Sequence, residues 1–183
     1  DTEMDSILNV KKLQKSKGKK IILLDVNIEL HRGEIVGFIG ANGAGKTTTM
    51  KCLMDLYSYK GKIEKENIKV GALTEEPCFY PYMSGLRNLK IDSMYYKDIS
   101  ANRVEDLIRE LDMSQYIGQK VKKYSLGMKQ RLGLAFALMN DPDVIILDEP
   151  MNGLDPQGVM VLRNTLKKLA HEKGKAILIS SHI

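Results

Sequence analysis

Short apolar runs recur along the chain and predict the strands of a buried sheet. The first two, "KIILLDVNIEL" (20–30) and "EIVGFIG" (34–40), flank the turn "HRGE", where a glycine supplies the flexible position. Three more follow: "IKVGAL" (68–73), "DVIILDEP" (143–150) and "KAILIS" (175–180). Nearly continuous runs of β-branched residues and leucine are typical of strands that are buried on both faces of a parallel sheet.

Helical patterns alternate with these runs. One helix is predicted over "KTTTMKCLMDLY" (46–57), after a glycine-rich loop, and another over "GVMVLRNTLKKLAHEKG" (158–174), which ends in basic residues and Gly174. The segment "NRVEDLIRELDM" (102–113) has an apolar face made of Val104, Leu107, Ile108 and Leu111. Residues from about 78 to 130 hold helical patterns and no convincing strand. The alternation predicts an α/β domain with a three-layer core and a helical insert.

Composition narrows the class of protein. The 183 residues suffice for one domain with a buried core, and 43% hydrophobic with 28% charged residues is typical of a soluble globular protein. No apolar run approaches the roughly 18–20 residues of a membrane span, and the acidic start "DTEMDSILNV" predicts no secretory signal. Because the chain stops directly after a strand pattern, we expect that a C-terminal segment is missing.

Two cysteines and a basic segment indicate no metal site, redox site or nucleic-acid site. Cys52 and Cys78 belong to no CxxC or Cys/His cluster and are expected to be reduced thiols. Much of the net charge of +5 lies in "KKLQKSKGKK" (11–20), and no aromatic side chain interleaves with it. We therefore interpret this segment as a solvated hairpin near a nucleotide or an anionic membrane surface, and expect no nucleic-acid partner.

The strongest motif is "GANGAGKT" (40–47), which matches G-x-x-x-x-G-K-[ST], follows an apolar strand and opens a helix. Its glycines let backbone N–H groups surround phosphate oxygens, and the helix N-terminus adds favourable partial charge. Lys46 is predicted to reach the β- and γ-phosphates, and the Thr47 hydroxyl to bind Mg²⁺. A chance glycine-rich turn is the alternative. The predicted nucleotide contacts here are Gly40, Asn42, Gly43, Ala44, Gly45, Lys46, Thr47 and Thr48.

An acidic pair ends the apolar run "VIILDEP". Burial of a carboxylate at a strand end is costly unless it meets a cation, so Asp148 is predicted to hold Mg²⁺ through water. Glu149 follows directly and is placed to act as a general base on attacking water. The alternative is a strand end with two solvated acids. Beside the phosphate loop, the pair indicates hydrolysis of a nucleoside triphosphate.

The order of motifs resembles the nucleotide-binding subunit of an ABC transporter, and the resemblance covers nearly the whole chain. It includes the phosphate loop (Walker A), a Q-loop region "VGALTEEPCFYPYMSGLRNL", the signature position "YSLGMKQR", "VIILDEP" (Walker B), the D-loop "MNGLD" and the H-loop "SSHI". The guanine-reading tetrapeptide N-K-x-D is absent from the sequence. The resemblance implies that Ser125 and Gly127 contact the γ-phosphate held by an opposing subunit. It places Asp155 at the dimer interface and His182 at the γ-phosphate.

The resemblance also implies a fold and partners. The fold would be a P-loop NTPase (RecA-like) core with an antiparallel β subdomain, over residues 1–77 and 131–183, and a helical subdomain over residues 78–130. ATP and Mg²⁺ would be the ligands. A second ATPase subunit, in a homodimer, and a separate transmembrane permease would be the partners, which places the chain in the cytoplasm at the inner face of the cell membrane. Phe79, Tyr80 and Tyr82 would contact the permease; the alternative is that they are simply packed or half-exposed.

Three features depart from the family pattern. In the common signature L-S-G-G-Q, Leu126 replaces the first glycine and Met128 the glutamine. Glu75 takes the place of the Q-loop glutamine, where a carboxylate could bind Mg²⁺ or orient water. The aromatic residue that stacks on adenine is absent, because Lys17 occupies its place and no Phe or Tyr precedes Phe38.

The departures point to one branch of the family. The combination of "YSLGMKQRL" with an acidic Q-loop is similar to the branch of bacitracin resistance and lantibiotic immunity, which implies export of antimicrobial peptides; a general drug exporter fits almost as well. A soluble ABC-type ATPase that acts on nucleic acid or ribosomes is the alternative. Such proteins usually carry long coiled-coil insertions or a second ATPase domain, and this sequence has neither.

Overall fold

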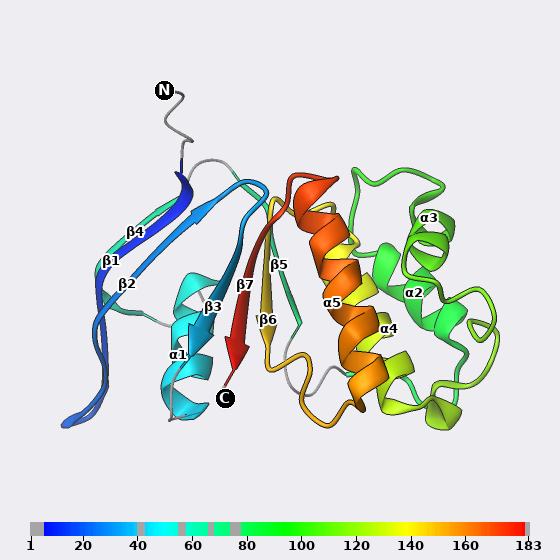
Figure 1. The fold of residues 1–183 in the computed structure, drawn as a ribbon, viewed down its shortest axis with the longest axis horizontal. Coiled ribbons are helices and arrows are strands. Elements are labelled where there is room, and N and C mark those ends of the chain that lie inside the picture. Colours follow the sequence, from blue (N-terminus) through cyan, green and yellow to red (C-terminus); the bar gives the residue numbers. More distant parts are fainter. Residues whose placement is uncertain (1–5, 40–42, 55–57, 66–67, 74–77, 182–183) are drawn as a thin grey trace.

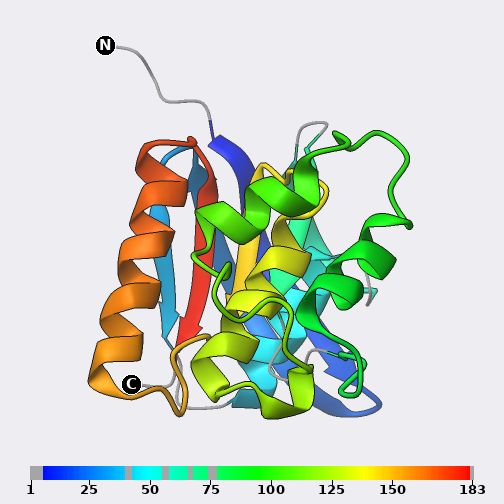
Figure 2. The same ribbon diagram turned by 90° about the vertical axis from the view of Figure 1, so that its right-hand side faces the viewer.

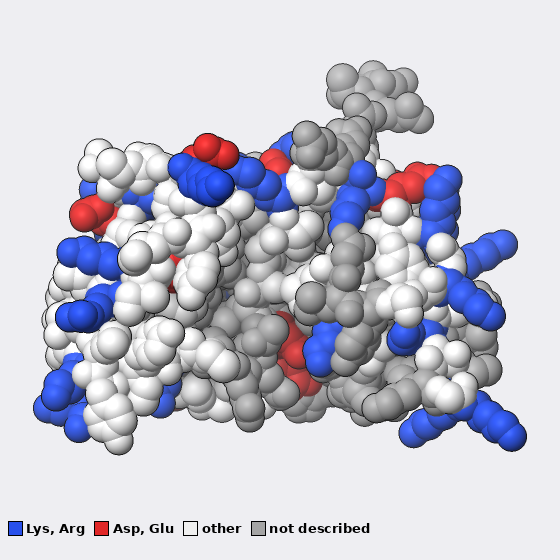
Figure 3. All heavy atoms as spheres, turned by 180° about the vertical axis from the view of Figure 1, so that it is seen from behind, with Lys and Arg blue, Asp and Glu red and all other residues white. Residues whose placement is uncertain are grey.

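Two sheets form the framework of the protein in the computed structural model, which describes residues 6–39, 43–54, 58–65, 68–73 and 78–181 (Figure 1). The first sheet is antiparallel, in the order β2-β1-β4, with β1 at Ser6–Lys17, β2 at Lys20–His31 and β4 at Lys60–Lys65. Gly18, with φ +62°, lies in the tight turn between β1 and β2. In the view from behind, basic side chains project from the side of the molecule that this sheet forms (Figure 3).

The second sheet is parallel, in the order β3-β7-β6-β5. Its strands are β3 (Ile35–Ile39), β5 (Val70–Leu73), β6 (Val144–Asp148) and β7 (Ala176–Ser181). Every residue of β6 is buried, as the apolar pattern predicts for a strand with both faces covered.

Helices cover both faces of the parallel sheet. Helix α1 (Gly43–Leu53) lies between the two sheets, whereas the other helices lie on the opposite face (Figures 1 and 2). These are α2 (Gly85–Ser93), α3 (Arg103–Glu110), α4 (Leu126–Leu138) and α5 (Pro156–His171), together with the short 3-10 helix η1 (Val121–Lys123). None of the described helices has the length and apolar character that crossing a membrane requires.

Strand β6 separates two hydrophobic cores because its side chains alternate between the faces of the sheet. Val144 and Ile146 pack with α1 and the antiparallel sheet, whereas Ile145 and Leu147 pack with the helices of the other face. The second core includes the four predicted apolar residues of α3, which are buried. The predicted α/β fold with a P-loop NTPase-type core is therefore confirmed.

One strand prediction was wrong, and strands β1 and β4 were not predicted. The run at 20–30 forms β2 of the antiparallel sheet rather than a strand of the parallel one. It pairs with β1 in a hairpin, and over residues 27–30 exposed and buried positions alternate, as in a sheet with one solvated face. Strand β4 was not predicted, since "KGKIEK" carries Ile63 as its one apolar residue.

The helical predictions hold with shifted ends. Helix α1 begins at Gly43, within the glycine-rich motif, rather than at Lys46, and α5 begins at Pro156 and ends at His171. Among the described residues, the segment 78–130 contains α2, α3, η1 and the start of α4, and none of the named strands. The boundary after residue 130 falls inside α4, and the division into subdomains stays a prediction.

Candidate nucleotide site

The carboxyl ends of three parallel strands meet at one edge of the sheet. Ser180 of β7 is paired with Phe38 of β3 on one side and with Asp148 of β6 on the other. Helix α1 starts at this edge, directly after the loop that follows β3 (Figure 1). The topology thus brings the phosphate-loop motif and the acidic pair together, although about a hundred residues separate them in the sequence.

The first turn of α1 supplies the anion-binding backbone. Gly43, Ala44, Gly45, Lys46 and Thr47 are all helical, so the N–H groups of the first three have no intrahelical acceptor, and the whole turn carries the positive end of the helix dipole. A phosphate fits such a helix start. Their side chains lie outside what the structure describes, as do Gly40 and Asn42 altogether. The Thr48 side chain is buried, so its predicted nucleotide contact stays a prediction.

Asp148 is held by Ser180. The residue is only 9% exposed, and its Oδ1 accepts a hydrogen bond of 2.7 Å from the hydroxyl of Ser180, which is fully buried. The same hydroxyl accepts a 3.1 Å hydrogen bond from the backbone N–H of Glu149. The sequence interpretation missed Ser180, because a serine inside an apolar strand run does not reveal where its hydroxyl points.

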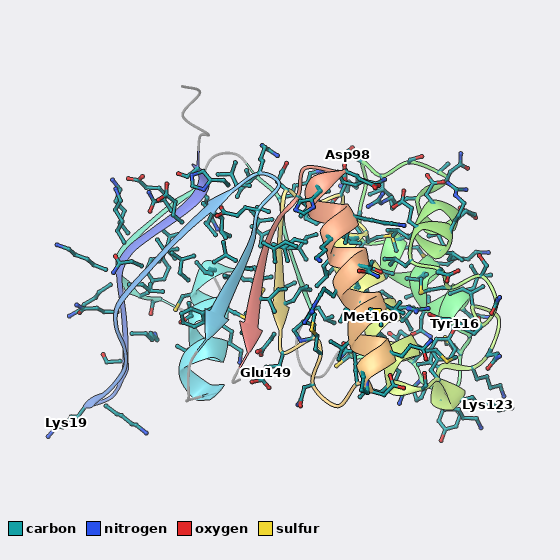
Figure 4. All side chains as sticks on the ribbon, viewed as in Figure 1. Lys19, Asp98, Tyr116, Lys123, Glu149 and Met160 are labelled. Carbon is teal, nitrogen blue, oxygen red and sulfur yellow. The ribbon has the colours of Figure 1, made fainter. Side chains whose placement is uncertain are left out.

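Glu149 adopts an unusual backbone conformation. Its φ of +46° lies in the left-handed region, which costs energy for a residue other than glycine. The N–H of Glu149 still donates a 3.2 Å hydrogen bond to Ser180 O, so the residue stays bonded to β7. The left-handed backbone therefore lies at the point where the chain leaves the sheet. Figure 4 shows Glu149 at the carboxyl edge of the parallel sheet, as the predicted general base requires.

The signature serine starts helix α4. Ser125 is the N-cap, with φ −65° and ψ 166°, and its Oγ accepts a 3.2 Å hydrogen bond from the N–H of Met128. The Met128 sulfur accepts from the N–H of Ser125 at 3.5 Å, which completes a capping box in which methionine takes the usual place of Glu or Gln. Ser125 remains exposed at the helix start, where a second anion can bind.

Tyr124 holds the start of α4 in place through a hydrogen bond and a ring contact. Its Oη donates a 3.0 Å hydrogen bond to Tyr116 O, and its ring packs edge-to-face on the Tyr116 ring with centroids 5.2 Å apart. Burial raises the pKa of Tyr124 to about 12. A Cβ at Gly85 would lie 2.1 Å from the Tyr124 Oη, so this contact requires glycine. The start of α4 is therefore fixed by packing within the helical segment.

The D-loop packs against the start of α4. A Cβ at Gly153, whose φ is +77°, would lie 2.8 Å from the Cδ2 of Leu126, and a Cβ at Gly127 would lie 3.9 Å from the Cδ2 of Leu154. Asp155 is exposed and caps α5, with its Oδ1 accepting a 2.7 Å hydrogen bond from Gly158 N. The structure thus joins the signature and the D-loop into one surface.

The two parts of the predicted site belong to opposite faces of the sheet. The phosphate-loop helix α1 packs on one face, and α4 with Ser125 packs on the other (Figure 1). Glu75 and His182, the predicted Q-loop and H-loop residues, lie outside the described residues, and their roles stay predictions.

Comparison with known proteins decides the family. The family described as "ABC transporter" matches residues 23–152. The chain belongs to the ABC transporter family. An "Uncharacterized ABC transporter ATP-binding protein YhcH" of Bacillus subtilis (strain 168) is 40% identical over 192 residues, which cover 98% of this chain and 63% of that protein.

Two relatives of this ABC chain carry names that specify a cargo. The "Bacitracin transport ATP-binding protein BcrA" of Enterococcus faecalis is 39% identical over 192 residues, covering 98% of this chain and 62% of the relative. The "Lantibiotic transport ATP-binding protein SrtF" of Streptococcus pyogenes is 39% identical over 186 residues, covering 97% and 80% respectively. The chain therefore spans less than two thirds of the length of several curated relatives, including BcrA and YhcH.

Solved structures agree with the ABC fold. An "ATP binding subunit of ABC transporter" superposes with a TM-score of 0.81 at 30% sequence identity, covering 97% of this chain and 80% of that one. The cbiO1 protein of Clostridium perfringens, titled as part of the ABC transporter complex cbiONQ, gives a TM-score of 0.87 at 25% identity, covering 98% and 79%.

An apolar groove of this ABC chain opens beside the start of α4. Its volume is about 280 Å³, and its lining includes Phe79, Leu126 and Lys129. Phe79 packs edge-to-face on Phe136, with centroids 5.2 Å apart, whereas Tyr80 is 52% and Tyr82 74% exposed. One of the three aromatic residues is therefore packed and two are exposed, and their contact with a permease stays a prediction.

Proposed function

We propose that this chain binds ATP with Mg²⁺, hydrolyses it and drives a separate membrane permease as one of two ATPase subunits. The observation that carries the proposal is the meeting of the α1 helix start with Asp148 and Glu149 at one edge of the parallel sheet. An anion-binding helix start beside a carboxylate pair is the arrangement that triphosphate hydrolysis requires, because one part holds the phosphates and the other the metal and the water.

Each residue of the site has a definite task in this proposal. The backbone N–H groups of Gly43–Thr47 hold the phosphate oxygens, and Lys46 neutralises the β- and γ-phosphates. Thr47, Asp148 and Glu75 are the residues that would hold Mg²⁺, which supplies charge neutralisation at the transferred phosphate when bound. Ser180 keeps the Asp148 carboxylate in one orientation through its 2.7 Å hydrogen bond. Glu149 takes the proton from attacking water, and His182 orients that water.

The second half of the site comes from another subunit. Ser125 and Gly127 offer a hydroxyl and a free helix start to the γ-phosphate of an ATP bound at the partner's phosphate loop. Asp155 follows Leu154, whose side chain lies near Gly127, so we place Asp155 on the same surface as Ser125 and Gly127. Two copies would close around two ATP molecules.

The named relatives support a permease partner and a peptide cargo. The names of BcrA and SrtF specify bacitracin and lantibiotic transport, so we infer export of antimicrobial peptides, with the chain at the inner face of the membrane. The exposed Tyr80 and Tyr82 beside the apolar groove make this the docking surface for a permease segment.

Replacement of Glu149 tests the catalytic proposal. We expect Glu149→Gln to bind ATP with unchanged affinity and to lose at least a hundredfold in steady-state hydrolysis, since the amide cannot accept the proton of the attacking water. Glu105→Gln, at an exposed position of α3, is the matched control and should hydrolyse ATP at the wild-type rate. Undiminished turnover by Glu149→Gln would remove Glu149 from the role of general base.

A further inference from the structure

A second cavity lies at the opposite edge of the parallel sheet from the nucleotide site. It has a volume of about 260 Å³ and is bordered by Lys69 and the strand β5, by the end of α4 near Asn140, and by Asp92 and Tyr96 at the end of α2. Lys69 and Pro142 come just before β5 and β6, so the cavity is at the amino ends of these strands. Among the residues whose side chains the structure describes, none proposed for ATP binding borders it.

Asp92 is in an unfavourable place for a carboxylate. It lies in the last turn of α2, at the negative end of the helix dipole, where a basic residue is favoured. Its Oδ2 is buried and has no hydrogen-bond partner in the described part of the chain. Burial raises the pKa of Asp92 to about 6, and no cationic side chain opposes that rise. An unpaired carboxylate of this kind costs stability unless a cation meets it.

Apart from Lys69, the lining suits a cation with an aliphatic stem. Tyr96 and Phe136 bring aromatic rings to the cavity, and such rings attract cations and pack against methylene groups. Burial raises the pKa of the Tyr96 phenol, and the nearby Asp92 carboxylate adds a smaller rise. The hydroxyl therefore stays neutral beside the carboxylate. The Asn140 amide adds a further acceptor. Among the described strands, β5 pairs with β6 alone, so its other edge leaves backbone groups without a strand partner.

We propose that this cavity binds an alkylammonium or alkylguanidinium group, with Asp92 as the counter-ion and Tyr96 and Phe136 against its stem. The bound cation would bridge α2 to β5 and the end of α4. It would therefore stabilise the packing of the helical segment on the sheet, independently of ATP.

Calorimetric titration with agmatine tests the site, because agmatine carries both a guanidinium and a primary ammonium on one aliphatic stem. The full chain is titrated at pH 8 in a buffer without primary amines. We expect saturable binding to the wild type and a loss of at least about tenfold in affinity in Asp92→Asn, since a hydrogen bond to a charged group disappears. The isosteric Asp98→Asn variant, at an exposed carboxylate, should bind agmatine as the wild type does.

The pH dependence provides a second readout. Agmatine binds the ionised carboxylate, and the pKa of Asp92 in the free protein is about 6, so protonation competes with the ligand as the pH falls below that value. Affinity at pH 5 should be about tenfold lower than at pH 8 in the wild type and unchanged in Asp92→Asn. Equal affinities of wild type and Asp92→Asn at pH 8, or no binding of agmatine to the wild type at millimolar concentration, would overturn the proposal.

A second probe assigns the source of the cation. N-acetyl-arginine amide presents the same guanidinium attached to a peptide backbone. Tighter binding of agmatine would assign the site to a free small cation, and tighter binding of the acetyl-arginine amide would assign it to an arginine side chain of a partner protein. Either assignment requires that Asp92→Asn lowers the affinity of the protein for the probe that binds more tightly.

Discussion

At the scale of single residues, the site depends on side chains that have two tasks each. The Ser180 hydroxyl donates a hydrogen bond to the Asp148 carboxylate and accepts one from the N–H of Glu149. One buried hydroxyl therefore holds both acidic residues in place. Ser125 caps α4 and is proposed to contact a phosphate. Asp155 caps α5 and is proposed to lie at the subunit interface. Such double use means that a substitution here affects stability and activity together.

Ser180→Ala tests whether the Ser180 hydroxyl has both of these tasks. Loss of a hydrogen bond to a buried carboxylate should lower the free energy of unfolding by about 1–3 kcal/mol in urea titration. Because the carboxylate that we propose to hold Mg²⁺ through water would lose its orientation, we also expect the Mg²⁺ concentration for half-maximal ATPase activity to rise about tenfold or more.

The control for Ser180→Ala is Ser93→Ala, which removes a hydroxyl that donates to the Lys90 carbonyl on an exposed helix. It should leave both measurements near their wild-type values. A Ser180→Ala protein with wild-type Mg²⁺ dependence would show that Ser180 does not position Asp148.

At the scale of elements, the N-terminus of α4 is held by a contact between residues that are distant in sequence. Gly85, at the start of α2, leaves room for the Tyr124 hydroxyl, and Tyr124 directly precedes Ser125. The proposed phosphate contact therefore depends on how α2 packs against the segment that leads into α4.

Gly85→Ala should displace Tyr124 and lower the free energy of unfolding by about 1–3 kcal/mol, because the new methyl group would overlap the phenol oxygen. Tyr124→Phe removes that oxygen, so the double variant should lose less stability than the sum of the two single variants. Denaturant unfolding of all four proteins measures this coupling. Strict additivity would mean that the two side chains do not interfere.

The elements also show what sequence can predict. The strands of the parallel sheet were readable because both faces are buried, which leaves a nearly continuous apolar run such as "VIILDEP". Strand β4 was not, since most of its residues are exposed and polar. The phosphate loop and the pair Asp148–Glu149 were predicted from local motifs. Ser180, the contact between Gly85 and Tyr124, and the Asp92 cavity depend on tertiary packing, which no local pattern encodes.

At the scale of the whole molecule, the parallel sheet separates two functional surfaces. The start of α1 lies on one side with the antiparallel sheet, and the start of α4 lies on the other with the helical segment (Figure 1). A nucleotide held by α1 therefore leaves Ser125 of the same chain facing outward. This separation is the physical reason for our central claim, that each ATP site is completed by a second copy of the chain.

The measurement that tests this claim most directly is the mass of the Glu149→Gln protein in solution with and without ATP, by light scattering coupled to size-exclusion chromatography. We expect the 20.6 kDa monomer without nucleotide and twice that mass with ATP and Mg²⁺. Adding Ser125→Arg should abolish the ATP-dependent dimer while ATP still binds the monomer, since a bulky cation then blocks the surface that faces the partner's phosphate. Ser114→Arg, at an exposed serine of the helical segment, should still dimerise. An ATP-dependent dimer of undiminished yield in the Ser125→Arg protein would contradict the account.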